Sequence, residues 1–372
     1  MSGKIRNVVL IGATGSIGCN VQRVVEANPD RLRFVALANR SKCRELDEAG
    51  RKFGVKTLCC VERDGEAALS EIATMPEADI VVMAAGGTVC LHPTLAAIEA
   101  GKDIALASKE VLVMAGEFVM EAARRRGVKL LPVDSEHNAI FQCLDGRGGG
   151  SAMKRILLTA SGGPFLNSTL EQMATVTPEQ ALKHPKWSMG QKISIDSATM
   201  ANKGLEMIEA RWLFDAQPEQ ISVVIHPQSI VHSMVEFADG STIAQMSPPS
   251  MTFAIQHTLL YPERIKGVDG PLDFTKRMEL SFMPPDEERF RALTLAREAM
   301  RTGMTAPAIY NAANEIAVDA FMKRQIPFLA IPALIEHTLS SVPIERVTGI
   351  DGLTEIDAVA RRVASDRIKH EF

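Results

Sequence analysis

Two acidic stretches far apart in the chain carry residues suited to binding a metal ion. Asp134 and Glu136 follow the short apolar run Lys129 to Val133, and Glu206 lies one helical turn after Asn202. If the three carboxylates converge, each pair at about 4 Å repels by roughly 4 kcal/mol at an effective dielectric constant of 20, so the cluster requires a cation. Oxygen ligands favour Mg²⁺ or Mn²⁺ over zinc. The sequence thus predicts a divalent metal site at Asp134, Glu136 and Glu206.

Each of these residues, taken singly, also has an ordinary structural explanation. Glu206 forms an i, i+3 pair with Lys203, and Asp134 and Glu136 cap a helix. If strand geometry continues past Val133, Asp134 and Glu136 point to one side and His137 to the other. His137 is therefore left out of the predicted metal site.

A glycine-rich turn, Gly12-Ala13-Thr14-Gly15-Ser16-Ile17-Gly18, joins the first predicted strand to the first predicted helix. The glycines allow a tight turn and close backbone approach, and the helix N-terminus offers free N–H groups to a pyrophosphate. A glycine turn without a ligand is the alternative. Its place in the first strand–helix unit of a six-strand pattern favours dinucleotide binding.

The second predicted strand ends in Asn39-Arg40-Ser41-Lys42. An NAD-selective site usually has Asp or Glu at this point, against the ribose hydroxyls. Two cations and a hydroxyl suit a 2′-phosphate instead, so the sequence predicts NADP(H). The alternative is that Arg40 and Lys42 are ordinary surface cations.

Two further features could contact a substrate. Lys109 follows the fifth predicted strand, where a lysine can orient a substrate oxygen, although a surface pair with Glu110 fits the same spacing. Residues 184–190 place Trp187 in a loop bounded by proline and glycine. Such a loop can close as a lid over a ligand, and a core anchor is the alternative.

The elements that position these residues follow an α/β pattern over the first 145 or so residues. Short β-branched runs alternate with amphipathic helical stretches such as Ile17 to Ala27, which predicts a Rossmann-like, doubly wound parallel sheet. The predicted strands are Asn7 to Ile11, Arg33 to Ala38, Lys56 to Val61, Asp79 to Ala84, Asp103 to Ala107 and Lys129 to Val133.

The later sequence changes in texture. The alternation from Ser222 to Phe237 predicts an antiparallel or mixed sheet, and helical periodicity returns near the C-terminus in Phe290 to Met300, Ala308 to Lys323 and Ile356 to Ile368. Glycine-rich residues 146–150 and the proline- and glycine-rich passage 261–285 indicate connectors. We therefore expect a Rossmann-like NADPH-binding domain at 1–148, an α+β catalytic and connective domain at 149–264, a linker at 265–286 and a helical domain at 287–372.

Composition excludes several classes of protein. With 41 Lys plus Arg against 45 Asp plus Glu, no broad cationic field is available for nucleic acid or an anionic membrane. No apolar run approaches the roughly 18 residues of a membrane helix, and no signal or transit segment precedes Val8, so we expect a cytoplasmic protein. The six cysteines form no CxxC motif, which favours reduced thiols over disulfides or a zinc site.

Five segments together resemble the 1-deoxy-D-xylulose 5-phosphate reductoisomerase family nearly end to end. They are GATGSIG, PVDSEHNAIFQ, HPKWSMGQKISIDSATMANKGLE, IHPQSIVHSMVEF and NAANEIAV, in this order. The resemblance implies an NADPH- and divalent-metal-dependent homodimer that converts 1-deoxy-D-xylulose 5-phosphate, a sugar phosphate, into 2-C-methyl-D-erythritol 4-phosphate. It implies a rearrangement followed by hydride transfer, in the first committed step of the non-mevalonate isoprenoid pathway. We expect a retro-aldol and aldol order for the rearrangement, and a direct ketol rearrangement is the alternative.

The resemblance also assigns roles by position in the matching motifs. It places Asp134, Glu136 and Glu206 on the metal, with these three and Lys109 as the catalytic residues. On the substrate it places Lys109, Ser135, Glu136, Ser161, His184, Trp187, Ser197, Asn202, Lys203 and Glu206, of which Ser161, Ser197, Asn202 and Lys203 grip the phosphate. On NADPH it places Thr14, Gly15, Ser16, Ile17, Arg40, Ser41, Lys42, Ser108, Glu110, Met189 and Gly190, with Trp187 and Met189 in a flexible flap.

Three positions depart from the family's usual pattern. Ser108 stands where Asn is common, Asn39 to Lys42 replaces a glycine-containing stretch, and Ser247 to Thr252 differs from the common GTPDMR. An NADP-dependent semialdehyde or homoserine dehydrogenase, which shares a Rossmann half, is the alternative enzyme. A protein that senses a nucleotide without catalysis is a third hypothesis consistent with the glycine-rich turn at residues 12–18.

Overall fold

The computed structural model describes residues 5–145, 152–187 and 189–371. The chain divides into two compact units. The first contains the described residues up to Val111 together with Glu117–Gln142 and Ser250–Thr275, and the second contains Leu112–Gly116 and the described residues of 143–249 and from 276 onward. The predicted glycine linker at 146–150 lies outside the described residues. The predicted division into two domains, a linker and a helical domain stays a prediction. The structure differs from it in that residues 250–264, expected in the α+β domain, group with the first unit.

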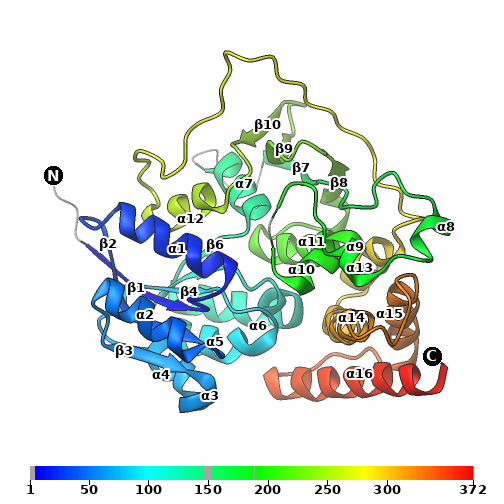
Figure 1. The fold of residues 1–372 in the computed structure, drawn as a ribbon, viewed down its shortest axis with the longest axis horizontal. Coiled ribbons are helices and arrows are strands. Elements are labelled where there is room, and N and C mark those ends of the chain that lie inside the picture. The colour runs from blue at the N-terminus through cyan, green and yellow to red at the C-terminus, as the bar shows by residue number, and fades with distance from the viewer. Residues whose placement is uncertain (1–4, 146–151, 188, 372) are drawn as a thin grey trace. The chain divides into compact units, whose positions relative to one another are not determined.

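The first unit is built on a parallel sheet with strand order β3-β2-β1-β4-β5-β6 (Figure 1). Its strands are β1 (Arg6–Ile11), β2 (Leu32–Asn39), β3 (Thr57–Cys60), β4 (Ile80–Met83), β5 (Asp103–Leu106) and β6 (Leu130–Pro132). All six predicted strands are confirmed to within two residues at each end. The order reverses between β1 and β4, which is where doubly wound sheets bind ligands.

Helices cover this sheet on both faces, so its strands are apolar on both sides. Val8 and Leu10 of β1 pack in one cluster with Val21 and Val24 of α1 and Ile255 of α12. The helices are α1 (Ser16–Ala27), α2 (Cys43–Phe53), α3 (Val61–Asp64), α4 (Ala67–Ala73), the 3₁₀ helix η1 (Thr88–Cys90), α5 (Leu91–Glu99), α6 (Glu110–Arg126), α7 (Ser135–Leu144) and α12 (Met251–Leu260). The predicted Rossmann-like fold is confirmed.

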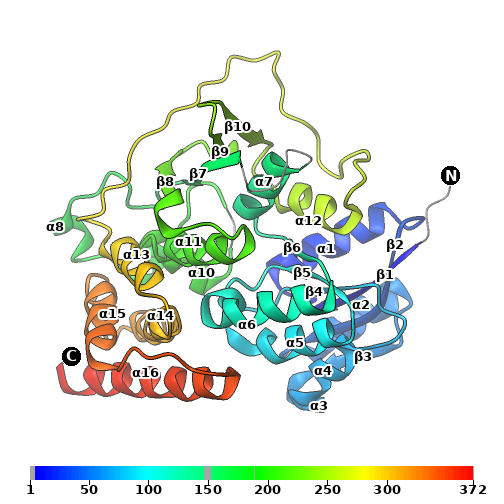
Figure 2. The same cartoon turned by 180° about the vertical axis from the view of Figure 1, so that it is seen from behind.

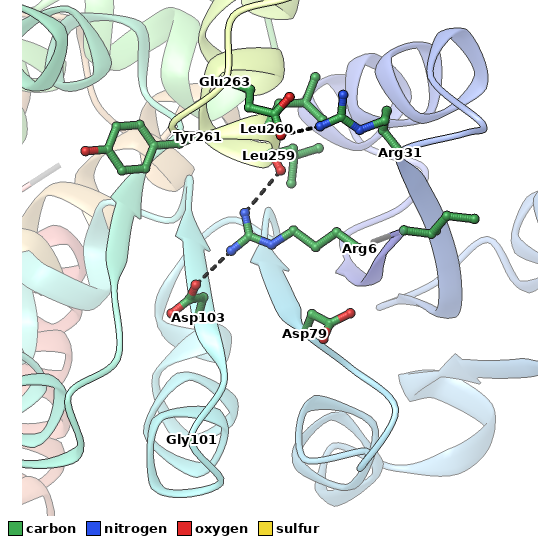
Figure 3. A pocket seen from close by; sticks show the side chains of 10 residues that line it. Arg6, Arg31, Asp79, Gly101, Asp103, Leu259, Leu260, Tyr261 and Glu263 are labelled. Atoms are coloured by element: carbon green, nitrogen blue, oxygen red, sulfur yellow. Dashed lines mark hydrogen bonds and ion pairs between the residues drawn. The ribbon is translucent and has the colours of Figure 1, made fainter. Parts of the chain in front are cut away.

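Charged side chains fasten the C-terminal end of α12 to the amino edge of the sheet (Figure 3). Arg6 Nη2 lies 2.7 Å from Asp103 Oδ2, and Arg6 Nη1 donates to the carbonyl oxygen of Leu259 at 3.1 Å. Arg31 pairs with Glu263 just beyond the helix. A helix end leaves carbonyl groups without intrahelical partners, so Arg6 both satisfies one of them and links β1 to β5.

We predict that Arg6→Met destabilises the protein by about 2 kcal/mol, because a part-buried carboxylate and a helix-terminal carbonyl both lose a charged donor. Urea denaturation followed by circular dichroism measures the change. Arg277→Met is the matched control, since the Arg277–Glu279 pair is exposed and such pairs contribute less than about 1 kcal/mol. Equal effects of the two substitutions would contradict this role of Arg6.

The second unit contains a mixed sheet with order β10-β9-β7-β8. Its strands are β7 (Met153–Ala160), β8 (Ile221–Ile225), β9 (Val231–Phe237) and β10 (Thr242–Met246), of which β7 and β8 are parallel and the other pairs antiparallel. The mixed sheet predicted around residues 222–237 is confirmed, and the stretch contains two of its strands, β8 and β9. The break includes Ser229, which has a left-handed φ of 54°.

Helices and the coil segments that connect them form the rest of the second unit (Figure 2). They are α8 (Leu170–Met173), α9 (Pro178–Ala181), α10 (Gln191–Ala198), α11 (Ala201–Leu213), the 3₁₀ helix η3 (Pro218–Gln220), α13 (Arg291–Thr302), α14 (Ala306–Met322), α15 (Ala330–Ser341) and α16 (Ile350–Glu371). The predicted C-terminal helices correspond to α13, α14 and α16. The sequence analysis missed α15, whose first turn contains Pro332, a position where the missing N–H is tolerated.

Two cysteines form a disulfide that the sequence analysis did not expect. Cys43 begins α2, Cys60 ends β3, and their Cα atoms are 5.6 Å apart. The prediction of reduced thiols is therefore wrong for this pair, because the return of the chain from α2 to β3 brings together residues that are 17 positions apart. The cysteines outside this disulfide are exposed Cys19 and buried Cys59, Cys90 and Cys143.

Among the described residues, no helix is both long enough and apolar enough to cross a membrane.

Candidate active site

The glycine turn after β1 is shaped for close backbone approach. Gly12 has a φ of +96°, and a Cβ there would lie 2.5 Å from the backbone of Ala84. A Cβ on Gly18 would lie 2.2 Å from the carbonyl oxygen of Gly12, so a larger residue at either position would displace backbone. Helix α1 begins at Ser16, directly after Gly15. The predicted cofactor residues Thr14 to Ile17 thus present a helix N-terminus at the carboxyl edge of the sheet.

The predicted ribose-phosphate segment follows β2 at the same edge. Arg40 and Lys42 are exposed, and Lys42 adopts the left-handed conformation with φ 60° and ψ 49° just before α2. Buried Asn39 donates its amide to the Thr14 hydroxyl and to the carbonyl oxygen of Ser41. Asn39, which the sequence analysis did not assign to the site, therefore links the two predicted cofactor segments. The sequence feature that could have identified Asn39 was its position at the end of the second strand, where NAD-selective proteins usually have an acidic residue.

Lys109 and Asp134 meet at the carboxyl ends of β5 and β6. Lys109 Nζ lies 2.7 Å from Asp134 Oδ2, and Lys109 is only 6% exposed. This excludes the alternative of a surface lysine. The neighbouring Ser108 hydroxyl donates to the carbonyl oxygen of Ala85 at 2.6 Å, and Glu110 begins α6 in a buried position.

The acidic motif after β6 is helical rather than extended. Helix α7 begins at Ser135, and Asp134 and Glu136 each offer an oxygen within 4.8 Å of the other's. The predicted closeness of these two carboxylates is thus correct, although the strand geometry used to argue it is wrong. His137 Nδ1 lies 3.8 Å from Asp134 Oδ2. The helix thus places His137 near Asp134, and the expectation that it points to the opposite side is wrong. Ser135 donates to Glu136 at 2.6 Å.

Glu206 lies in α11 of the second unit with both oxygens engaged. Asn202 donates to Oε1 and Lys203 to Oε2, and Glu206 is only 1% exposed. A buried carboxylate is stable only with charged or hydrogen-bonding partners, and both partners come from the same helix at i−4 and i−3. Asn202, Lys203 and Glu206, which the sequence analysis predicted from this motif, are therefore in direct contact.

Two predicted phosphate contacts come together through a glycine. Gly163 has a φ of +69°, and a Cβ there would lie 2.6 Å from the carbonyl oxygen of Ser197 at the end of α10. Ser161, at the end of β7, is held by the same turn, since the Gly163 N–H donates to its hydroxyl oxygen at 3.2 Å. Ser161 and Ser197 thus come from two segments in direct backbone contact.

Hydrogen bonds fix the tautomer of His184. Its Nδ1 accepts from the backbone N–H groups of Lys186 at 3.2 Å and Trp187 at 3.0 Å. The hydrogen of the neutral ring must then lie on Nε2, which donates to Ser161 Oγ at 3.0 Å. Because the Ser161 oxygen also accepts from Gly163, its own hydrogen is directed elsewhere, which suits a phosphate oxygen.

The predicted flap residues lie between His184 and α10. Trp187 is half-buried, with its ring centroid 6.4 Å from that of His232. Met189 is half-buried, and Gly190 is the residue before α10. The loop therefore leads directly into the helix that carries Ser197. Its closing over a ligand stays a prediction.

A buried polar group behind this region escaped the sequence analysis. Asp196 is 1% exposed, and its two oxygens accept from Asn314 of α14 and from Lys192, each at 2.8 Å. Asn314 belongs to the NAANEIAV segment, whose helical periodicity predicts only a packing helix. Glu209, fully buried one turn after Glu206, was also missed. In both cases the only sequence signal was a polar residue on an apolar helix face.

Burial lowers the pKa of His184 below 6.5. Because the folded value lies below the unfolded one, the stabilisation from its neutral form is present above about pH 6.5 and is lost as the pH falls toward the folded pKa. We predict that the Michaelis constant for a phosphate-bearing substrate rises several-fold as the pH falls below the lowered pKa of His184, because protonation removes the Nδ1 acceptor from the 184–187 loop. A pH series of initial rates measures this, and the same rise in His184→Gln would contradict the assignment.

Three family models match the chain. The model described as 1-deoxy-D-xylulose 5-phosphate reductoisomerase matches residues 8–65 and 62–116. The model described as the C-terminal domain of 1-deoxy-D-xylulose 5-phosphate reductoisomerase matches residues 130–214, and the DXP reductoisomerase C-terminal domain matches 246–363.

Similar proteins cover the chain nearly completely. The 1-deoxy-D-xylulose 5-phosphate reductoisomerase of Dechloromonas aromatica is 48% identical over 100% of this chain and 99% of its own length, and that of Heliobacterium modesticaldum is 48% identical over 98% of both. A solved structure of the Zymomonas mobilis enzyme with NADPH has a TM-score of 0.91 and 43% identity, covering 99% and 100% of the two chains. A DOX-P reductoisomerase with NADPH, fosmidomycin and magnesium has a TM-score of 0.93 and 40% identity, covering 98% of both.

Proposed function

Because this chain belongs to the 1-deoxy-D-xylulose 5-phosphate reductoisomerase family, we propose roles for its residues in the reaction of that family. The enzyme is an NADP-dependent oxidoreductase that converts 1-deoxy-D-xylulose 5-phosphate into 2-C-methyl-D-erythritol 4-phosphate with NADPH and a divalent metal. The observation that carries the residue assignment is the acidic pair Asp134 and Glu136, which lies at the same sheet edge as the dinucleotide turn. The full-length match favours this reaction over that of a semialdehyde or homoserine dehydrogenase.

Asp134, Glu136 and Glu206 would hold the Mg²⁺ or Mn²⁺ ion. The donor set fits such an ion, since it consists of carboxylate oxygens, and two of them lie within 4.8 Å of each other. The buried Glu206 forms an ion pair with Lys203. When bound, the cation polarises the substrate's ketone oxygen and NADPH supplies the hydride that reduces the rearranged aldehyde.

Lys109 and Lys203 would have two tasks. In the chain alone they neutralise Asp134 and Glu206, which would otherwise be buried and uncompensated. With a divalent cation held by Asp134, Glu136 and Glu206, the ammonium groups of Lys109 and Lys203 would be available to substrate oxygens. We assign Lys109 to the sugar, with Ser135 beside it, and Lys203 to the phosphate.

The phosphate end of the substrate would be held by Ser161, Ser197, Asn202 and Lys203. The support is the contact between the Ser161 turn and the end of α10, and the His184 bond that leaves the Ser161 hydrogen free to donate outward. Binding energy from this remote group positions the reacting carbons, and Trp187 with the rest of the flap excludes water. We propose a retro-aldol and aldol order, in which the bond between carbons three and four breaks and a branched aldehyde forms.

NADPH would lie with its pyrophosphate on the α1 turn (Thr14, Gly15, Ser16 and Ile17) and its 2′-phosphate on Arg40, Ser41 and Lys42. The support is the positive φ and close packing of Gly12 and the cationic segment linked to Thr14 by Asn39. Ser108, Glu110, Met189 and Gly190 would serve its nicotinamide end. We further propose that the enzyme is a cytoplasmic homodimer, as the family resemblance and the composition indicate.

We predict that Glu206→Gln weakens Mn²⁺ binding and the rate by at least about 10- to 100-fold, because one anionic oxygen donor is lost while the volume stays the same. Electron paramagnetic resonance titration of free Mn²⁺ measures binding without requiring turnover. Glu219→Gln is the control, since Glu219 is an exposed acid on a surface ion pair. Unchanged Mn²⁺ affinity in Glu206→Gln would remove Glu206 from the metal site.

We predict that Asn314→Ala raises the Michaelis constant for the sugar phosphate about tenfold but leaves that for NADPH unchanged, because Asp196, next to Ser197, loses a buried hydrogen bond. Steady-state kinetics with each substrate varied in turn provides the test. Asn311→Ala is the matched control: Asn311 lies one turn earlier in α14 and pairs with Glu315 instead of α10.

The double variant Asp196→Asn with Asn314→Asp exchanges the two partners of this bond. It should recover part of the lost substrate affinity if the amide–carboxylate contact positions Ser197. A Michaelis constant raised equally in Asn311→Ala and Asn314→Ala would indicate a loss of general stability instead.

A further inference from the structure

The disulfide of the first unit closes a short loop at the proposed cofactor site. Cys43 is the first residue of α2 and is half-buried, and Cys60 is the last residue of β3 and is buried. Asn39 is the register partner of Cys60 in the parallel ladder between β2 and β3. Residues 40–42, which would hold the 2′-phosphate, thus lie between two residues that are both linked to Cys60. Figure 1 shows the elements concerned, β2, α2 and β3, next to one another.

The loop also contacts its surroundings through its backbone. The carbonyl oxygen of Arg40 accepts from the Glu62 N–H at 3.0 Å and lies 3.9 Å from the Cys60 sulfur. On the other side, Asn39 joins the Ser41 carbonyl to the Thr14 hydroxyl. A change at the disulfide therefore reaches both predicted phosphate-binding segments.

The backbone conformation of Lys42 makes residues 40–42 dependent on the Cys43–Cys60 disulfide. Lys42 is a non-glycine residue with φ 60°, a conformation that persists where the surrounding structure holds it. The bond at Cys43, one residue later, supplies such a hold. Without it, Lys42 is free to relax to a right-handed conformation, which moves its ammonium group.

We propose that the Cys43–Cys60 disulfide is a reversible redox-modification site, reduced by dithiols, that controls the affinity of the enzyme for NADPH through the 2′-phosphate segment. The proposal rests on the proposed cofactor assignment of Arg40, Ser41 and Lys42. The oxidised state holds the segment ready for the phosphate. The reduced state must order it on binding, which lowers affinity.

The exchange chemistry has a defined direction. A dithiol thiolate attacks the half-buried Cys43 sulfur, forms a mixed disulfide and releases Cys60 as the leaving thiolate. The second thiol of the reductant then attacks the mixed disulfide and releases Cys43. Two electrons and two protons pass to the protein, which gains two thiols, while the dithiol becomes a cyclic disulfide.

The test uses the full-length protein isolated without reductant. Alkylation followed by peptide mapping shows whether Cys43 and Cys60 are bonded, and fluorescence titration gives the affinities for NADPH and NADH before and after dithiothreitol. Reduction should weaken NADPH about tenfold, because a few residues must then be ordered on binding, and should change NADH much less. Cys43→Ser should show the weaker NADPH affinity with and without dithiothreitol.

Cys19→Ser is the matched control, since Cys19 is an exposed free thiol in α1 and its loss should leave the response to dithiothreitol intact. Equal, measurable NADPH affinity in the two states of the native enzyme overturns this proposal alone. So does alkylation of Cys43 in the enzyme isolated without reductant. Failure to bind NADPH in either state overturns the cofactor assignment together with this proposal.

Discussion

Compensation of buried negative charge is the constraint on which the site depends. Asp134 and Glu206 are both largely withdrawn from water, and each is paired with a lysine, Lys109 or Lys203. Removing one partner of such a buried pair costs about 3–5 kcal/mol, so each lysine contributes to keeping its carboxylate buried. In the proposed metal-bound state a divalent ion would compensate the carboxylates in place of the lysines. The same lysine side chains would then stabilise the fold before binding and contact the substrate afterwards.

Strand direction and helical spacing place the charged side chains of Lys109, Asp134 and Glu206. Lys109 and Asp134 follow neighbouring parallel strands, β5 and β6, whose carboxyl ends necessarily share one edge. The dinucleotide turn after β1 lies at this edge too, because all strands of the sheet run in the same direction. Glu206 receives its partners from the preceding turn of its own helix. Strand direction and helical spacing thus determine most of the local geometry.

This explains which features sequence reasoning could predict. The six strands were predictable because a sheet covered on both faces needs continuous apolar runs. The glycine turn was predictable because position 12 has a positive φ, which favours glycine. The closeness of Asp134 and Glu136 was predicted from the wrong element, since both a strand and a helix N-terminus bring i and i+2 near each other here. The disulfide and the Asp196–Asn314 bond join residues 17 and 118 positions apart, and no local pattern encodes such contacts.

The missed contacts have one feature in common, which is that each fixes a segment proposed to bind a phosphate group. Asn314 and Lys192 fix Asp196, the neighbour of Ser197, and Asn39 with the disulfide fixes the segment proposed for the 2′-phosphate. Hydroxyl and lysine side chains alone bind phosphate weakly if each must first be ordered, because every immobilised side chain costs about 0.5–1.5 kcal/mol. Segments fixed beforehand avoid that cost, so more of the binding energy of the two anionic ends remains to align the reacting carbon with the hydride donor.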